Sequence, residues 1–317
     1  MPAIALAPLK EMTPTGSVPL HTGTSRGYAW STVIIGSRLS EIICRHFGFE
    51  LAIWILPLSQ TILLLGLALI AARLHPNKSL AGFILTVAAL KFGWDVVVPR
   101  IEASTVFQSA LHNLSWGGRF FLLRAVRTIG VGFLILSLIG SGIGRRELFL
   151  RLGNWRAPVN PGPFLRFRRP INWTRFAAIL LLIFGVVLPL YLGFTLHPQI
   201  ELRRLLFVLP WAVATSALNA ANEEFQCRSV LLARLRHVVV PKEAVLLTAV
   251  LFAVDHYFGQ PSGWATVLMA GILGWILAKS MMETRGFSCA FTIHFVQDMV
   301  IFGFLALPAT DLSLARS

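Results

Sequence analysis

Two adjacent carboxylates and an arginine lie in the segment ANEEFQCRSVLLARL, residues 221–235: Glu223, Glu224 and Arg228. Successive helix residues point about 100° apart, so the two glutamates face different directions, whereas residues 224 and 228 lie one turn apart and can pair. The spacing therefore predicts that Arg228 neutralises Glu224 and that Glu223 is left over. A leftover carboxylate in a low-dielectric setting can serve as a general base near neutral pH.

Two histidines occur downstream in apolar surroundings. LFAVDHYFG places Phe252 four residues before His256, and FTIHFVQDMV places His294 four residues before Asp298, so each pair shares a helix face. At 1.5 Å per residue, Glu223, His256 and His294 lie roughly 16, 20 and 10 Å from the inner ends of their helices, so they can meet at one level. The pattern predicts a hydrolytic site in which Glu223 and His256 activate a water and His294 with Asp298 stabilises an oxyanion.

Two questions about this site stay open at the level of sequence. Asp298 can donate a hydrogen bond to an oxyanion only while it holds its proton, and otherwise it would orient His294 and stabilise its charged form. The second question is the cofactor: either none is required, or zinc is bound. If zinc is bound, its ligands are expected to be Glu223, His256 and His294, by analogy with sites made of two histidines and one glutamate.

The elements that must position these residues are membrane-spanning helices. Only 13% of the 317 residues are charged, 56% are hydrophobic, and the mean hydropathy is +0.71. Residues 51–72 and 176–194 carry no charge and approach the roughly 20 residues that a bilayer requires. Further expected spans cover residues 80–98, 120–144, 205–233, 244–258, 263–278 and 287–307. We therefore expect an all-α, polytopic transmembrane bundle of about eight spans, with Lys91 and Asp95 paired on one helix face.

The formal net charge of +14 is concentrated in loops. In the segment 145–175, only Glu147 opposes eight arginines: Arg145, Arg146, Arg151, Arg156, Arg166, Arg168, Arg169 and Arg175. Such a loop is typical of the cytoplasmic side, where it would contact anionic lipid headgroups, and no nucleic-acid-binding motif accompanies it. The short loops 73–78, 234–242 and 279–285 are also basic, which is consistent with this orientation. We expect a multi-pass protein of the cell (cytoplasmic) membrane with no nucleic-acid partner.

The chain divides by composition into five parts. The N-terminal residues 28–49 mix apolar and charged side chains and are expected to lie along the membrane interface. The parts are a flexible or interfacial segment (1–50), N-terminal transmembrane helices (51–144), the basic loop (145–175), a core that carries the site (176–307) and a tail (308–317).

Three motifs in order, EEFQCR, FAVDH and HFVQD, resemble the CPBP family of CAAX-protease and bacteriocin-processing intramembrane endopeptidases, which includes the CAAX prenyl protease type 2 and Abi-like proteins. The resemblance covers roughly residues 176–307. It implies that Glu223 and His256 activate the water and that His294 and residue 298 form the oxyanion site. It also implies supporting roles for three residues: Glu224, Arg228 and Phe252. Eukaryotic CAAX proteases of the family carry Asn where this chain has Asp298.

The resemblance implies an intramembrane endopeptidase that hydrolyses a peptide bond in a membrane-associated protein, a prenylated protein or a peptide. Two other classes stay open: a non-proteolytic immunity or scaffold protein, and a transporter. The chain lacks the paired hydrophobic halves with matching Gly/Pro breaks that many transporters have. A scaffold would not need every expected catalytic position to be filled, whereas this chain fills them all.

Overall fold

The computed structural model describes most of the chain, and most of the part that it describes is helical. Within that part there is no β-strand, and one isolated bridge joins Pro158 to Asn172. The described residues are 23–49, 54–74, 78–162, 165, 167, 169–196, 202–259 and 262–307. Residues 1–22 of the expected N-terminal segment 1–50, and the expected tail 308–317, lie outside them. The all-α prediction is confirmed.

Seven helical stretches in the described part are long and apolar enough to cross a membrane: Ile55–Leu74, Ser79–Glu102, Trp116–Leu138, Trp173–Phe194, Arg203–Leu235, Trp264–Thr284 and Ser288–Ala306. They match seven of the expected spans, so a multi-pass integral membrane protein is confirmed. The eighth expected span, residues 244–258, corresponds to helix α13 (Pro241–Asp255). Its 15 residues are about 22 Å long, which is less than the roughly 30 Å hydrocarbon core, so α13 ends inside the bundle.

The N-terminal helix α1 (Gly23–Gly36) packs inside the bundle, against α3 (Ile55–Leu74), α4 (Ser79–Lys91) and α13. Its buried face repeats at helical spacing: Ala29, Thr32, Val33 and Gly36. These residues are small or β-branched, so neighbouring helices can approach closely. Helix α1 therefore packs against the bundle, and the expectation that residues 28–49 lie along the membrane interface stays a prediction.

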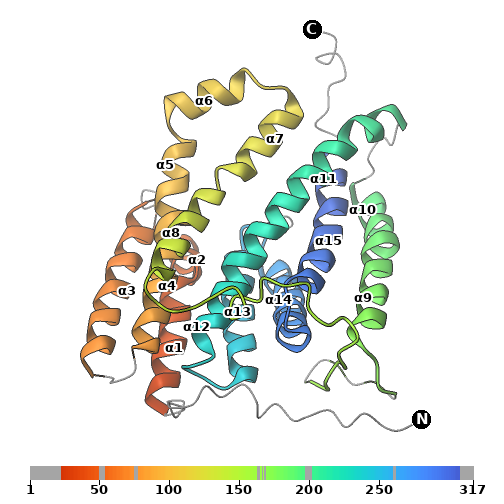
Figure 1. The fold of residues 1–317 in the computed structure, drawn as a ribbon. Helices are drawn as coiled ribbons and strands as arrows, with labels where there is room; N and C mark the ends of the chain where they lie inside the picture. The colour runs from red at the N-terminus through yellow and green to blue at the C-terminus, as the bar shows by residue number, and fades with distance from the viewer. Residues whose placement is uncertain are drawn as a thin grey trace.

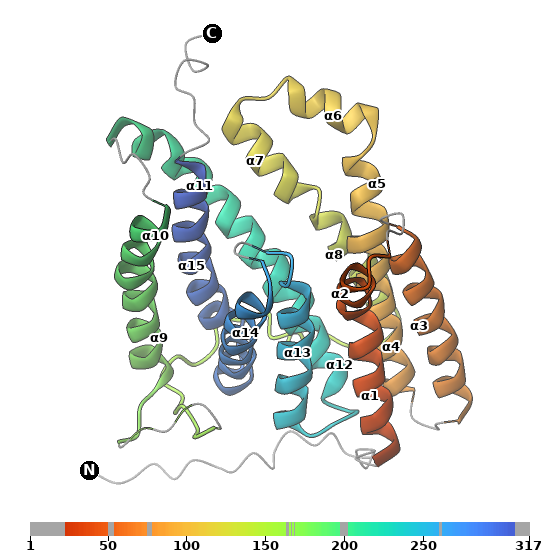
Figure 2. The same ribbon diagram turned by 180° about the vertical axis from the view of Figure 1, so that it is seen from behind.

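Helix α4 continues through a π-helical turn, η2 (Phe92–Val97), into α5 (Val98–Glu102). The predicted pair on this helix forms, because Lys91 Nζ lies 2.9 Å from Asp95 Oδ2. The chain then passes through α6 (Thr105–His112), α7 (Trp116–Ala125) and α8 (Thr128–Leu138), which returns beside α4 (Figures 1 and 2). Arg38, before α2 (Leu39–His46), donates to Asp95 at 2.8 Å and ties the N-terminal segment to η2.

The described part of the basic loop is fixed to the turn between α14 (Trp264–Thr284) and α15 (Ser288–Ala306). Gly153 has φ +78°, and a Cβ atom built on it would lie 2.8 Å from the Cα of Gly286, so both positions require glycine. Trp155 donates to Ser288 Oγ at 2.7 Å, and Trp173 donates to Glu283 at 2.9 Å.

The C-terminal half carries the motifs. Helix α9 (Trp173–Leu182), η3 (Ile183–Val187) and α10 (Leu188–Leu196) form one outer span. The following elements are α11 (Leu202–Glu224), η4 (Phe225–Val230), α12 (Leu231–Leu235), α13, α14 (Trp264–Thr284) and α15 (Ser288–Ala306). Helix α11 packs along α15, and α13 packs along α14, so the three motifs approach one another in the centre of the bundle (Figure 1).

Candidate active site

Three helices bring the predicted residues together. Glu223 and Glu224 end α11, His256 follows the last residue of α13, and α15 supplies His294 and Asp298. The π-helical turn η4 begins directly after Glu224, and such turns often occur at functional sites. The short α13 places His256 at depth, because the chain leaves the helix there and does not continue across the membrane.

Glu224 and Arg228 form the predicted pair. Arg228 NH1 lies 2.9 Å from Glu224 Oε1, and both side chains are completely buried. The guanidinium also lies 3.6 Å from the centroid of the Phe252 ring, a cation–π contact. This contact gives Phe252 a structural role beside the ion pair and ties α13 to η4.

The same Glu224 oxygen holds His294, with Nδ1 of the imidazole 2.7 Å away. Because the carboxylate accepts, Nδ1 of His294 carries a proton and Nε2 faces the other way. Nε2 lies 3.6 Å from Glu223 Oε2 and 3.5 Å from Asp298 Oδ1. The two glutamates therefore leave the helix in different directions, as the sequence predicts, but both contact one imidazole.

His256 is oriented by its own helix. Its Nδ1 lies 2.7 Å from the carbonyl oxygen of Phe252, and its ring centroid lies 4.1 Å from that of Phe252. A carbonyl oxygen only accepts, so Nδ1 is protonated and Nε2 of the neutral ring carries a lone pair. This Nε2 atom lies 4.0 Å from Glu223 Oε2.

Glu223 lies at the centre of these contacts and is only 7% exposed. Its Oε2 atom is buried and has no hydrogen-bond donor among the described residues, although two imidazole Nε2 atoms lie 3.6 and 4.0 Å away. A water molecule hydrogen-bonded to all three atoms would fit these separations. The site therefore presents one carboxylate oxygen and two imidazole nitrogens to a common point.

Asn219 is a site residue that the sequence reasoning missed. Its Nδ2 group donates to Glu223 Oε1 at 3.1 Å and to Asp298 Oδ2 at 2.9 Å. An amide NH₂ has two hydrogens, so both donors are used in holding the two carboxylates side by side. The available signal was its position one helical turn before Glu223, on the same face of α11.

Two further cations that the sequence reasoning did not assign to the site lie near its carboxylates. Arg124 at the end of α7 is within electrostatic range of Glu223 and Asp298, and Arg127 is within range of Glu223. Arg124 packs over the Phe302 ring, with Cζ 5.1 Å from the ring centroid. These arginines partly offset the negative charge of the carboxylates across the bundle.

The sequence left open whether these side chains bind zinc. In the described part of the chain, no group of three or more His, Cys, Asp or Glu side chains is arranged to hold a metal ion. The three expected zinc ligands, Glu223, His256 and His294, do converge, but with the separations given above. We therefore derive no step through a metal, and the zinc alternative stays a prediction.

Comparison with known families supports the motif assignment. Residues 205–300 match the family described as Rce1-like, type II CAAX prenyl endopeptidase. This segment contains all three motifs, and the match confirms the resemblance to the CAAX-protease family that they indicated. Neither curated proteins nor solved structures gave a match.

Proposed function

We propose that this protein is an intramembrane endopeptidase that uses Glu223 and His256 to activate a water molecule. The observation that carries the proposal is the buried Oε2 atom of Glu223, which has no hydrogen-bond donor within the described part of the chain and faces the Nε2 atoms of two histidines. A buried acceptor without a partner is costly, and a bound water is the simplest group that would satisfy it. The match to an endopeptidase family over residues 205–300 supports the same activity.

In the first step, water bound at Glu223 loses a proton and its oxygen attacks the carbonyl carbon of the scissile peptide bond. Glu223 and the lone pair of His256 Nε2 are the groups within reach of that proton. The attack produces a tetrahedral intermediate with a negatively charged oxygen. When the C–N bond breaks, the same proton is delivered to the leaving nitrogen, and the products are a carboxylic acid and an amine. Transfer of the acid proton to the amine then gives a carboxylate and an ammonium group.

His294 and Asp298 are the groups proposed to stabilise the oxyanion. His294 donates from Nε2 only when its ring is charged, and the neighbouring carboxylates of Glu224 and Glu223 favour that charged form. Because Glu224 already orients the ring through Nδ1, Asp298 is not needed for that purpose. This division favours Asp298 as a proton-bearing donor.

The substrate class that fits is a peptide bond in a membrane-associated protein, a prenylated protein or a peptide. The site lies among helices that can cross the membrane, so a substrate segment must enter an apolar environment to reach it. The alternatives, a transporter or a non-proteolytic immunity or scaffold protein, do not explain why Asn219 and Glu224 each fix a proton-handling side chain.

The test is proteolysis by purified protein in liposomes, using a membrane-anchored reporter peptide with a quenched fluorophore pair. Glu223→Gln removes the base while it preserves volume, and we expect a loss of at least about 10²–10⁴-fold, the usual contribution of a general base. Glu41→Gln is the matched control, because it makes the same chemical change on α2, at a glutamate that is more exposed than Glu223 and pairs with Arg45. Turnover by Glu223→Gln equal to that of the control would refute the mechanism.

A further inference from the structure

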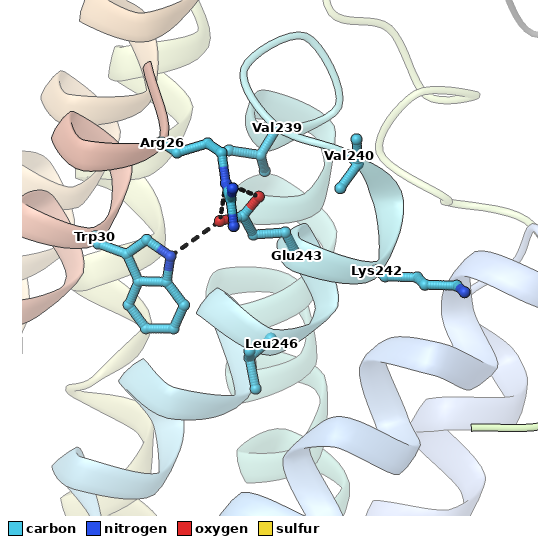
Figure 3. Close-up of a pocket in the computed structure, with 7 residues that line it drawn as sticks. All are labelled: Arg26, Trp30, Val239, Val240, Lys242, Glu243 and Leu246. Atoms are coloured by element: carbon cyan, nitrogen blue, oxygen red, sulfur yellow. Dashed lines mark hydrogen bonds and ion pairs between the residues drawn. The ribbon is translucent and has the colours of Figure 1, made fainter. Parts of the chain in front are cut away.

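A cavity lies between the first turns of α1 and α13, remote from the proposed active site. Its volume is about 470 Å³, within the range of small-molecule sites. It opens at the start of α13, whereas His256 follows the last residue of that helix, so roughly 20 Å of helix separates the two places. Its lining residues include Arg26, Trp30, Lys242, Glu243 and Leu246 (Figure 3).

A buried carboxylate, Glu243, lines the cavity and joins α13 to α1. Glu243 is 8% exposed and accepts from Arg26 Nε, at 2.9 Å to each oxygen, and from Trp30 Nε1 at 3.0 Å. Both donors come from α1, and Figure 3 shows them converging on Glu243 from one side. These contacts fix the relative position of the two helices that form the walls.

The cavity retains a net positive charge after this pairing. Among the lining residues that the structure describes, Arg26 and Lys242 are cations and Glu243 is the single anion, which leaves one positive charge. Arg26 uses only Nε for Glu243, and its side chain is 60% exposed. Lys242 is exposed and forms no ion pair with the described residues. The terminal nitrogens of Arg26 are therefore available to an anion. Figure 3 shows the Lys242 side chain extended away from Arg26 and Glu243, so its amine adds positive charge at the rim of the cavity.

Further along each helix from these cations, α1 and α13 both present exposed apolar side chains at one-turn intervals. On α1 the series is Arg26, Trp30 and Ile34, and Ile34 is 49% exposed. On α13 it continues from Lys242 to Leu246, which is 43% exposed. Each series runs from a cation at the helix start to exposed apolar surface further along, so the polarity changes in the direction from membrane surface to membrane interior.

We propose that this cavity binds the headgroup of an anionic phospholipid, with the acyl chain lying along Trp30 and Leu246. The Arg26 guanidinium would contact the phosphate and the exposed Lys242 amine would turn toward it. The apolar stripe matches a hydrocarbon chain but not a free anion in water. Anionic lipid also agrees with the expected orientation, because the cavity lies at the end of the bundle where the basic segment 234–242 is found. The inference is independent of the proposed protease activity.

The test is lipid binding to the purified full-length protein in detergent, measured by native mass spectrometry and by thermal unfolding. The probes are dioleoyl phosphatidylglycerol, dioleoyl phosphatidylcholine and inorganic phosphate. For wild type we expect phosphatidylglycerol to bind more tightly than phosphatidylcholine and to raise the unfolding temperature. Lys242→Gln should bind phosphatidylglycerol about fivefold more weakly, which corresponds to about 1 kcal/mol per basic residue at a membrane surface. Leu246→Gln should also weaken binding.

Lys78→Gln is the matched control, since Lys78 is exposed and lies outside the cavity, directly before α4. Equal losses in Lys242→Gln and Lys78→Gln would overturn the proposal, because the effect would then be general surface charge. Equal binding of the two lipids would also overturn it. Protection by inorganic phosphate as strong as that by phosphatidylglycerol would replace the lipid site with a site for a free anion.

Discussion

The Nδ1 atom of His294 lies 2.7 Å from Oε1 of Glu224. The same oxygen accepts from Arg228 at 2.9 Å, so one buried carboxylate serves both a charge pair and a histidine. This arrangement gives Glu224 the orienting function that a triad aspartate has in serine hydrolases. The two adjacent glutamates therefore have different roles. Glu224 orients the His294 ring, and Glu223 faces the point where water would bind.

The first prediction concerns stability. Glu224→Gln should lower the free energy of unfolding by about 3–5 kcal/mol, because it leaves the buried Arg228 charge without its partner. Glu223→Gln should change stability much less, since no arginine among the described residues forms a direct ion pair with Glu223. Both are measured by unfolding in mixed detergent micelles, followed by tryptophan fluorescence. The double variant Glu224→Gln/Arg228→Met should recover part of the loss, and equal stability of the two single variants would contradict the pairing argument.

The second prediction concerns the pH dependence of Asp298. If its proton supplies a hydrogen bond to the oxyanion, Asp298→Asn should retain activity and extend it to higher pH, because an amide donates at every pH and an acid only while protonated. If Asp298 instead acts as a carboxylate that orients His294, the same change should cost about 10⁴-fold. The pH-rate profiles of wild type and variant distinguish these two roles. We expect activity to be retained, because Glu224 already orients the His294 ring.

The third prediction tests Asn219 as a positioning residue. Asn219→Ala removes both donors that hold Glu223 and Asp298, and displacements of about 1 Å at a catalytic site cost on the order of 10²-fold in rate. The loss should appear in kcat more than in KM. The pH-rate profile should also shift, because Glu223 and Asp298 would no longer share a hydrogen-bond donor that holds them side by side. Asn222→Ala makes the same change three residues later on the helix, and an equal loss there would assign the effect to the helix as a whole.

The fourth prediction concerns the buried charges of the N-terminal half. Lys91 is 3% exposed, and its charge is paired with Asp95, which also accepts a hydrogen bond from Arg38. Asp95→Asn should therefore destabilise the protein by about 3–5 kcal/mol. Glu41→Gln breaks more exposed pairs and should cost less than about 1 kcal/mol. Thermal unfolding in detergent distinguishes the two, and similar melting temperatures would show that Lys91 is satisfied in another way.

The fifth prediction addresses zinc. The mechanism above requires no metal, so prolonged treatment with a chelator should leave proteolysis unchanged. Elemental analysis of the untreated protein provides a readout that does not depend on activity. Stoichiometric zinc, together with loss of activity on chelation and recovery on adding the metal, would instead support coordination by Glu223, His256 and His294.

Local spacing was enough to predict the contacts within single helices. The pairs Glu224–Arg228 and Lys91–Asp95 form as predicted, because residues four apart in a helix are neighbours whatever surrounds them. The all-α membrane architecture also followed from composition and from the lengths of the apolar segments, since the bilayer thickness fixes the length of a span. These features depend on the chain alone or on the solvent around it.

Tertiary packing decided what spacing could not. Residues 223 and 224 diverge by about 100°, and only the position of α15 beside α11 allows His294 to contact both. Asn219 became a site residue for the same reason, because its second acceptor, Asp298, lies on the other helix. The mixed composition of residues 28–49 predicted an interfacial segment, and the apolar run 244–258 predicted a span. Only the structure shows that α1 packs against α3, α4 and α13, and that α13 packs along α14. Contacts between distant segments depend on how helices pack, and that information is distributed over the whole chain.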